Sequence, residues 1–150
     1  MASITDLMSH DHRECDELYA RAENAASKGD WNTARTELQA FIEAVEAHFA
    51  AEENIIFPRF EAASGMTGGP TQMMRHEHVE MRKSFDSMTD ALDRQDRDDF
   101  AGEGETLLIM MQQHNMKEEN ILYPMCDTHL GREMSTLGPE ITRQLKASGS

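Results

Sequence analysis

Apolar side chains recur at helical spacing in four stretches of the chain. In the second stretch, Phe41, Val45, His48, Glu52 and Ile55 follow one another in alternating steps of four and three residues. Such steps keep all of these side chains on one face of an α-helix. The same alternation joins Met8, His12, Cys15, Tyr19, Ala22 and Ala26; Met74, His78, Met81, Phe85, Met88 and Leu92; and Leu107, Met111, His114, Glu118, Ile121 and Met125. The pattern predicts four amphipathic helices.

Turn-forming residues separate these stretches. Gly29 and Asp30 follow the first, and the Asp30 carboxylate can accept hydrogen bonds from the first-turn amides of a helix that begins at Trp31. The sequence GMTGGP at 65–70 predicts a loop, and the polar, Asp-rich segment 94–99 precedes the fourth stretch. Glycines and a proline after residue 130 leave one short helix in a tail of about residues 131–150.

The chain also repeats itself at an offset of 66 residues. HFAAEENIIFP at 48–58 returns as HNMKEENILYP at 114–124, with six of the eleven positions identical. The repeating unit is therefore a pair of helices joined by a short connection. We predict an all-α, single-domain protein over residues 1–150. Two repeated helical hairpins form an up-and-down four-helix bundle over about residues 4–128.

Six polar residues interrupt the apolar faces of the predicted helices: His12, His48, Glu52, His78, His114 and Glu118. A buried carboxylate is costly unless it is paired or coordinates a metal ion. One interpretation is that each Glu pairs with a protonated His, or that helix rotation brings both Glu residues to solvent. The other is that the six residues hold metal ions, and all four helices contribute to the set.

Helix geometry favours the metal interpretation. Residues i and i+4 stack about 6 Å apart along one helix face, so that an imidazole and a carboxylate can converge on one ion. Four imidazoles and two carboxylates are too many for a tetrahedral site and suit two ions bridged by the carboxylates. Nitrogen and oxygen donors without thiolate favour iron or manganese, and the ligands alone do not separate these metals or a mixed pair.

The same periodicity assigns the neighbouring polar residues. Glu53 and Glu119 are turned about 100 degrees away from the inner face, which predicts positions beside the site or at the surface. Tyr19 shares the inner face with His12, and a packed aromatic side chain is its default role. The alternative is that the Tyr19 phenol reaches the metal pocket as a ligand or hydrogen-bond donor.

Two prolines follow the repeated Glu residues. Pro58 and Pro124 each lie six residues after Glu52 or Glu118. Because proline lacks an amide donor and clashes with the preceding turn, we expect each to kink or end its helix just past the site.

Composition narrows the classes of function. With 28 acidic and 14 basic residues, the chain of 150 residues carries a formal charge of -14, which disfavours nucleic acid or an anionic membrane as a partner. No apolar run reaches the length of a membrane span, the start shows no secretory signal, and two cysteines make no disulfide framework. Small molecules, metals or other proteins remain as partners, and we expect a cytoplasmic protein. Its oligomeric state is left open.

The order His12, His48-x-x-x-Glu52, His78, His114-x-x-x-Glu118 resembles the hemerythrin-like, or HHE cation-binding, family over about residues 4–128. The resemblance implies a four-helix bundle with a non-haem di-iron centre. Glu52 and Glu118 would bridge the irons together with an oxo or hydroxo group, and the four His would be terminal ligands. The family has a further His one turn before His78, where this chain has Met74, so the resemblance implies a more open second iron.

The four-His, two-Glu pattern is similar to that of two subgroups. One comprises small stand-alone proteins associated with peroxide breakdown, and the other is the iron-sulfur centre repair family, which carries an additional cysteine-containing domain. Three hypotheses follow. The centre decomposes peroxide, or it reversibly binds oxygen, nitric oxide or iron as a sensor or carrier, or its metals are structural. The missing fifth His disfavours oxygen storage, and we favour redox chemistry with peroxide, dioxygen or nitric oxide in stress defence.

Overall fold

The computed structural model describes residues 2–147, which are helical except for short loops. The α-helices are α1 (Ile4–Ser27), α2 (Trp31–Ala51), α3 (Phe57–Ser64), α4 (Pro70–Asp93), α5 (Arg97–Lys117), α6 (Tyr123–Leu130) and α7 (Met134–Lys146). Two π-helical turns, η1 (Glu52–Ile56) and η2 (Glu118–Leu122), connect α2 to α3 and α5 to α6. A 3₁₀ turn, η3 (Gly131–Glu133), precedes α7.

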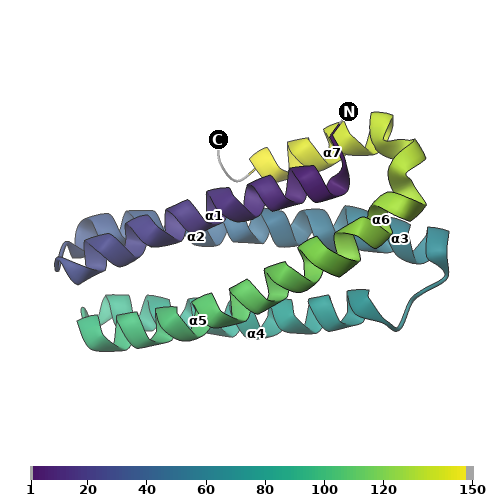
Figure 1. The fold of residues 1–150 in the computed structure, drawn as a ribbon. Coiled ribbons are helices and arrows are strands. Elements are labelled where there is room, and N and C mark those ends of the chain that lie inside the picture. The colour runs from purple at the N-terminus through teal and green to yellow at the C-terminus, as the bar shows by residue number, and fades with distance from the viewer. Residues whose placement is uncertain (1, 148–150) are drawn as a thin grey trace.

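The helices form two antiparallel hairpins that lie side by side (Figure 1). Helix α1 packs along α2 in the first hairpin, and α4 packs along α5 in the second. Contacts of α1 with α5 and of α2 with α4 close the bundle. The predicted all-α, hemerythrin-like four-helix bundle is therefore confirmed.

The predicted turns have clear local causes. Asp30 and Asp96, 66 residues apart, both cap the following helix, and each carboxylate accepts a hydrogen bond from the amide three residues later. The residues just before them, Gly29 and Gln95, both have positive φ angles, of 75° and 53°. Glycine adopts this left-handed backbone without steric cost, whereas glutamine adopts it at a steric cost.

The two prolines do not end the helical backbone. The amide of Phe57 donates to the carbonyl of Glu52, five residues earlier, and Tyr123 donates to Glu118 in the same way. Each π turn ends two residues before a proline, which has no amide to donate and is the second residue of α3 or α6. The expected break is therefore a local widening of the helix at the two Glu residues.

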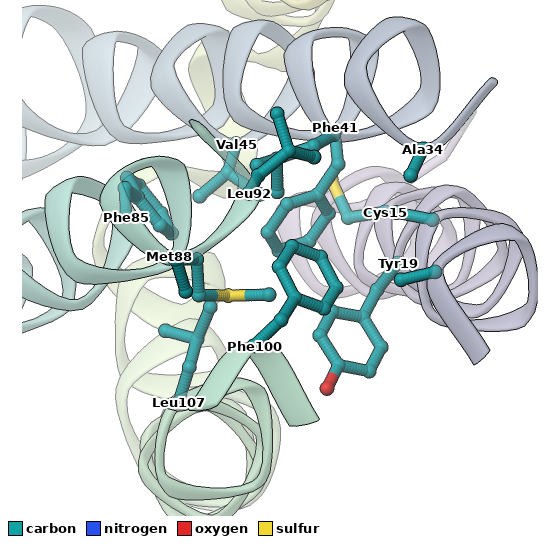
Figure 2. Close-up of a cluster of buried hydrophobic side chains, with 14 of the residues drawn as sticks. Cys15, Tyr19, Ala34, Phe41, Val45, Phe85, Met88, Leu92, Phe100 and Leu107 are labelled. Carbon is teal, nitrogen blue, oxygen red and sulfur yellow. The ribbon is translucent and has the colours of Figure 1, made fainter. Parts of the chain in front are cut away.

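Two apolar clusters fill the bundle and leave a polar layer between them. The first includes Cys15, Phe41 and Phe85 at the end where α1 turns into α2 (Figure 2). The second includes Ile4, Phe60 and Leu137, at the end that carries α3, α6 and α7. The buried His and Glu residues lie between the clusters, so both ends of the polar layer are shielded from water.

Helix α7 covers the second cluster. It packs against α1 and α2 (Figure 1), with Leu137 and Ile141 fully buried. At its edge, Arg59 donates to Glu140 at 2.9 Å. Within residues 2–147 no helix is both long and apolar enough to cross a membrane.

Candidate metal centre

The structure brings the six predicted metal ligands together in the polar layer. His12 projects from α1, His48 from α2, His78 from α4 and His114 from α5, while Glu52 and Glu118 begin the two π turns. Their relative exposure lies between 0% and 5%. Both carboxylates are fully buried, which contradicts the alternative that helix rotation exposes them to solvent.

These residues form two donor groups that share one carboxylate. Glu52, His78, His114 and Glu118 make the first group, and His12, His48 and Glu118 make the second. In each group one donor atom per residue lies within 4.8 Å of the others. Glu118 Oε1 lies 3.1 Å from His12 Nε2, and Glu118 Oε2 lies 3.3 Å from His114 Nε2. One carboxylate therefore faces both groups with different oxygens.

The hydrogen bonding of the first group is incomplete. Glu52 Oε1, His78 Nε2, His114 Nε2 and Glu118 Oε2 are buried and have no hydrogen-bond partner. Buried polar atoms without partners are rare and costly. His78 Nε2 and Glu52 Oε1 are only 3.0 Å apart, but they do not meet in hydrogen-bond geometry. Paired His and Glu thus do not satisfy the cluster by themselves, and the donor set fits a metal ion.

A tyrosine lies at the second group. The Tyr123 hydroxyl is fully buried, 2.7 Å from Glu52 Oε2 and 2.8 Å from Glu118 Oε1. It also lies 3.2 Å from His48 Nε2 and 3.3 Å from His12 Nε2. A phenol has one proton and cannot satisfy four acceptors at once. Its oxygen is therefore positioned either to coordinate a metal ion held by the second group or to donate a hydrogen bond to one of the two carboxylates.

Helical spacing in the sequence points to a different tyrosine, Tyr19. Tyr19 lies in the first apolar cluster with its ring edge-on to Phe41, and its hydroxyl donates to Glu23 at 3.4 Å (Figure 2). The structure does not bring Tyr19 to the donor groups. Tyr123 was missed because straight α-helical spacing after Glu118 points to position 121 or 122, whereas the π turn brings position 123 inward. The proline at 124 is the sequence signal for that turn.

Each candidate His donates through its outer ring nitrogen to a carboxylate. The Nδ1 atoms of His12 and His78 lie 2.6 Å from Glu119 and Glu53, respectively. Those of His48 and His114 lie 2.8 Å from Asp11 and 2.7 Å from Glu77. This leaves Nε2 of every ring facing the centre. A carboxylate on the second nitrogen is a common support for histidine ligands of metals, because it fixes the tautomer and the ring orientation.

These four supporting carboxylates are related by the 66-residue repeat. Asp11 and Glu77 are 66 residues apart, as are Glu53 and Glu119. Sequence reasoning placed Glu53 and Glu119 beside the site or at the surface, but it gave no role to the acidic residues that directly precede His12 and His78. Their repetition at the same offset is the signal that could have found them.

Burial and charged neighbours together set the ionisation of the buried groups. Burial alone would lower the pKa of His114, but the charge of Glu118 raises it to about 9. Burial alone would raise the pKa of Glu52, yet His48 holds it well below its ordinary value. Burial and the charge of Glu118 raise the pKa of Tyr123, so the phenol keeps its proton. A metal ion must therefore displace a proton from the His114 imidazole.

The comparison with protein families agrees with this site. The model of the hemerythrin HHE cation-binding domain matches residues 3–126. The chain belongs to the hemerythrin family. Members of this family bind small gas ligands. Together with the buried His and Glu cluster, family membership indicates metal binding, for which iron is typical.

An uncharacterized hemerythrin-like protein of Schizosaccharomyces pombe is 30% identical over 139 residues. The match covers 90% of this chain but only 64% of that relative, so the chain spans just under two thirds of the relative's length. No solved structure matches the chain.

Proposed function

We propose that this hemerythrin-family protein holds two iron ions and reacts with peroxide, dioxygen or nitric oxide in oxidative or nitrosative stress defence. Peroxide decomposition is the favoured reaction. The supporting observation is the pair of donor groups that share Glu118, since one carboxylate facing two groups suits two ions close together. Manganese would suit the same donors, and the experiments below measure both metals.

The donor set is also incomplete for an oxygen carrier. Met74 is buried in the second apolar cluster, one turn before His78, where the hemerythrin resemblance has a further imidazole. The group of His78, His114 and the two carboxylates therefore offers four donor atoms, fewer than iron commonly takes. When bound, two irons would supply electron exchange with a small oxidant at the open position.

The protein residues have distinct proposed roles. The carboxylates of Asp11, Glu53, Glu77 and Glu119 hold the four imidazole rings in place through Nδ1. The Tyr123 hydroxyl oxygen lies within 2.8 Å of an oxygen of each inner carboxylate, and it carries a proton that it can donate to either of them. The apolar clusters on either side exclude bulk water from the layer. In peroxide decomposition, one H2O2 is oxidised to O2 and a second is reduced to two waters, so the protons released by the first are consumed by the second.

Metal analysis is the first test. We expect about two irons per chain in freshly purified protein and a clear loss in Glu52→Ala, since this change removes a carboxylate that contributes to the centre. His76→Ala is the control, because His76 is exposed and its nearest carboxylate, Glu80, lies 4.0 Å away. Folded native protein that takes up no metal when offered ferrous iron or manganese would contradict the proposal.

Oxygen evolution from hydrogen peroxide is the second test. We expect turnover in the metal-loaded protein and its loss in His114→Ala, with the bundle still helical by circular dichroism. A stable nitric oxide or oxygen adduct without turnover would instead support a sensor or carrier, the alternative that also includes iron-sulfur centre repair. Unfolding on chelation, without any of this chemistry, would mean that the metals are structural.

A further inference from the structure

A polar groove lies on the surface between α1 and α5, directly beside the candidate centre. His12, Arg13, Asp16, Asn115 and Glu119 are among the residues that line it. Its volume is about 530 Å³, far more than the roughly 30 Å³ that a water molecule occupies in the liquid. Molecules of the size of hydrogen peroxide therefore fit in it.

The groove reaches the second donor group at the His12 imidazole. His12 contributes to the groove, where its Nδ1 meets Glu119. The opposite nitrogen, Nε2, lies 3.1 Å from Glu118, the carboxylate common to both donor groups. A molecule that passes the His12 ring therefore arrives at the second donor group, beside the carboxylate that both groups share.

The equivalent position between α4 and α2 is closed. The repeat offset of 66 places Phe49 where the groove has Asn115, and Arg82 where it has Asp16. Phe49 is 2% exposed and stacks on His78 with ring centroids 3.8 Å apart. Two layers thus cover His78, because the Arg82 guanidinium lies 5.0 Å above the Phe49 ring.

Ion pairs hold the outer layer of this cover. Arg82 donates to Glu53 at 3.1 Å, and Glu53 in turn accepts from His78 Nδ1. A second carboxylate, Glu46, accepts from the same guanidinium at 2.9 Å. A small molecule approaching His78 would have to break this network and move a buried aromatic ring. Approaching His12, it meets Asp16 and Asn115 in place of that guanidinium and that ring, and the hydrogen bond between His12 and Glu119.

We propose that small, uncharged, polar molecules reach the centre through the groove between α1 and α5, past His12, and that Phe49 and Arg82 close the corresponding route past His78. The lining carries two carboxylates, Asp16 and Glu119, against the one guanidinium of Arg13, and this excess of negative charge makes the entrance unfavourable for anions. Hydrogen peroxide, which is uncharged at neutral pH, fits the entrance. This inference rests on the proposed function, since it assigns the route to the same centre.

Exchanging residues between the repeats tests the route. The double variant Asp16→Arg/Asn115→Phe copies the closed cover into the open groove, where Glu119 can pair with the new guanidinium as Glu53 does with Arg82. Gln113→Phe is the control, because Gln113 is exposed on α5 and does not line the groove. Metal content is measured for every protein before use.

Two rates are then compared by stopped-flow spectroscopy: nitric oxide binding to the ferrous protein and oxidation of the ferrous protein by hydrogen peroxide. We expect both bimolecular rate constants of the double variant to be about tenfold below those of the native protein. This fall corresponds to a filled groove that is open for about a tenth of the time. Gln113→Phe should match the native protein in both.

The outcomes separate the two proposals. Native-like rates in a fully loaded double variant would overturn the proposed route while leaving the proposed function intact. Native protein that binds no metal, or forms no adduct and does not react, would refute the proposed function itself. If the double variant loads metal poorly, Asn115→Phe alone is measured against the same control and judged by the same rates.

Discussion

Replacing Gly104 with alanine provides a quantitative test of how α1 and α5 pack at the first apolar cluster. A Cβ atom at Gly104 would lie 2.5 Å from the Tyr19 hydroxyl oxygen and 3.2 Å from Met88 Cε. The methionine end is flexible and can move. The Tyr19 ring cannot easily move, because it is buried and packs edge-on against Phe41.

Two opposing effects set the magnitude. Alanine gains about 1 kcal/mol over glycine in a helix interior, while overpacking a core costs roughly 1–3 kcal/mol. We expect Gly104→Ala to lower the free energy of unfolding by about 1 kcal/mol. In a Tyr19→Phe background the hydroxyl is gone and the nearest ring atom is Cζ at 3.4 Å, an ordinary contact. There the same change should stabilise by about 0.5 kcal/mol.

The assay is urea unfolding followed by far-ultraviolet circular dichroism on the native protein, both single variants and the double variant. We expect a coupling energy of about 1.5 kcal/mol between the two positions. Gly102→Ala on the same helix is the control. Nothing lies within 4 Å of a Cβ atom at Gly102, so this change should raise the free energy of unfolding. Stabilisation by Gly104→Ala in the native background would refute this reasoning. Tyr19→Phe should also leave metal content unchanged, because Tyr19 lies away from the donor groups.

The remaining predictions concern the loop, the supporting carboxylates, the metal and pH. Gln95→Gly should raise the free energy of unfolding by about 1 kcal/mol in urea titrations, because the backbone there is left-handed and the equivalent residue of the first hairpin is glycine. Glu77→Gln should weaken metal binding by about 10- to 100-fold in competition with a chelator, because it weakens the hydrogen bond that orients His114. Removing the metal should lower the melting temperature in a calorimeter, by an amount that grows with metal affinity, since the ions bind only the folded state. Glu61→Gln should cost about 1 kcal/mol at neutral pH, because Arg75 holds the pKa of Glu61 below its ordinary value of 4.5. The stability that a lowered carboxyl pKa provides is present above the pKa of the unfolded chain and is lost as the pH falls through the pKa of the folded protein. The difference in the free energy of unfolding between native and variant protein should therefore shrink below about pH 4.5.

Much of the site was predictable because helix periodicity is a local property. The alternation of four and three residues placed His12, His48 and His78 on inner faces, and the structure buries all three. The repeat supplied the hairpin arrangement, since two similar halves of a chain pack in similar ways. The order of polar residues within each half then indicated a shared layer.

Regular helical spacing assigned the wrong buried face after the second π turn. Regular spacing placed Ile121 on the inner face of the last long helix, but Ile121 is 57% exposed and Leu122 is 1% exposed. A π turn adds one residue to the helical repeat, so the buried face moves by one position after it. The same shift brings Tyr123 to the centre, which is why the straight-helix pattern favoured Tyr19 as the tyrosine to consider.

The sequence by itself determined the four amphipathic helices, their division into two similar hairpins and the residues that could hold metal. Tertiary structure decided which carboxylate supports which imidazole, because His12 and Glu119 come from different hairpins and meet only when the bundle closes. It also decided that Phe49 and Arg82 cover His78 while a groove adjoins His12. Helical spacing is set by neighbours along the chain, whereas these contacts depend on how distant segments pack.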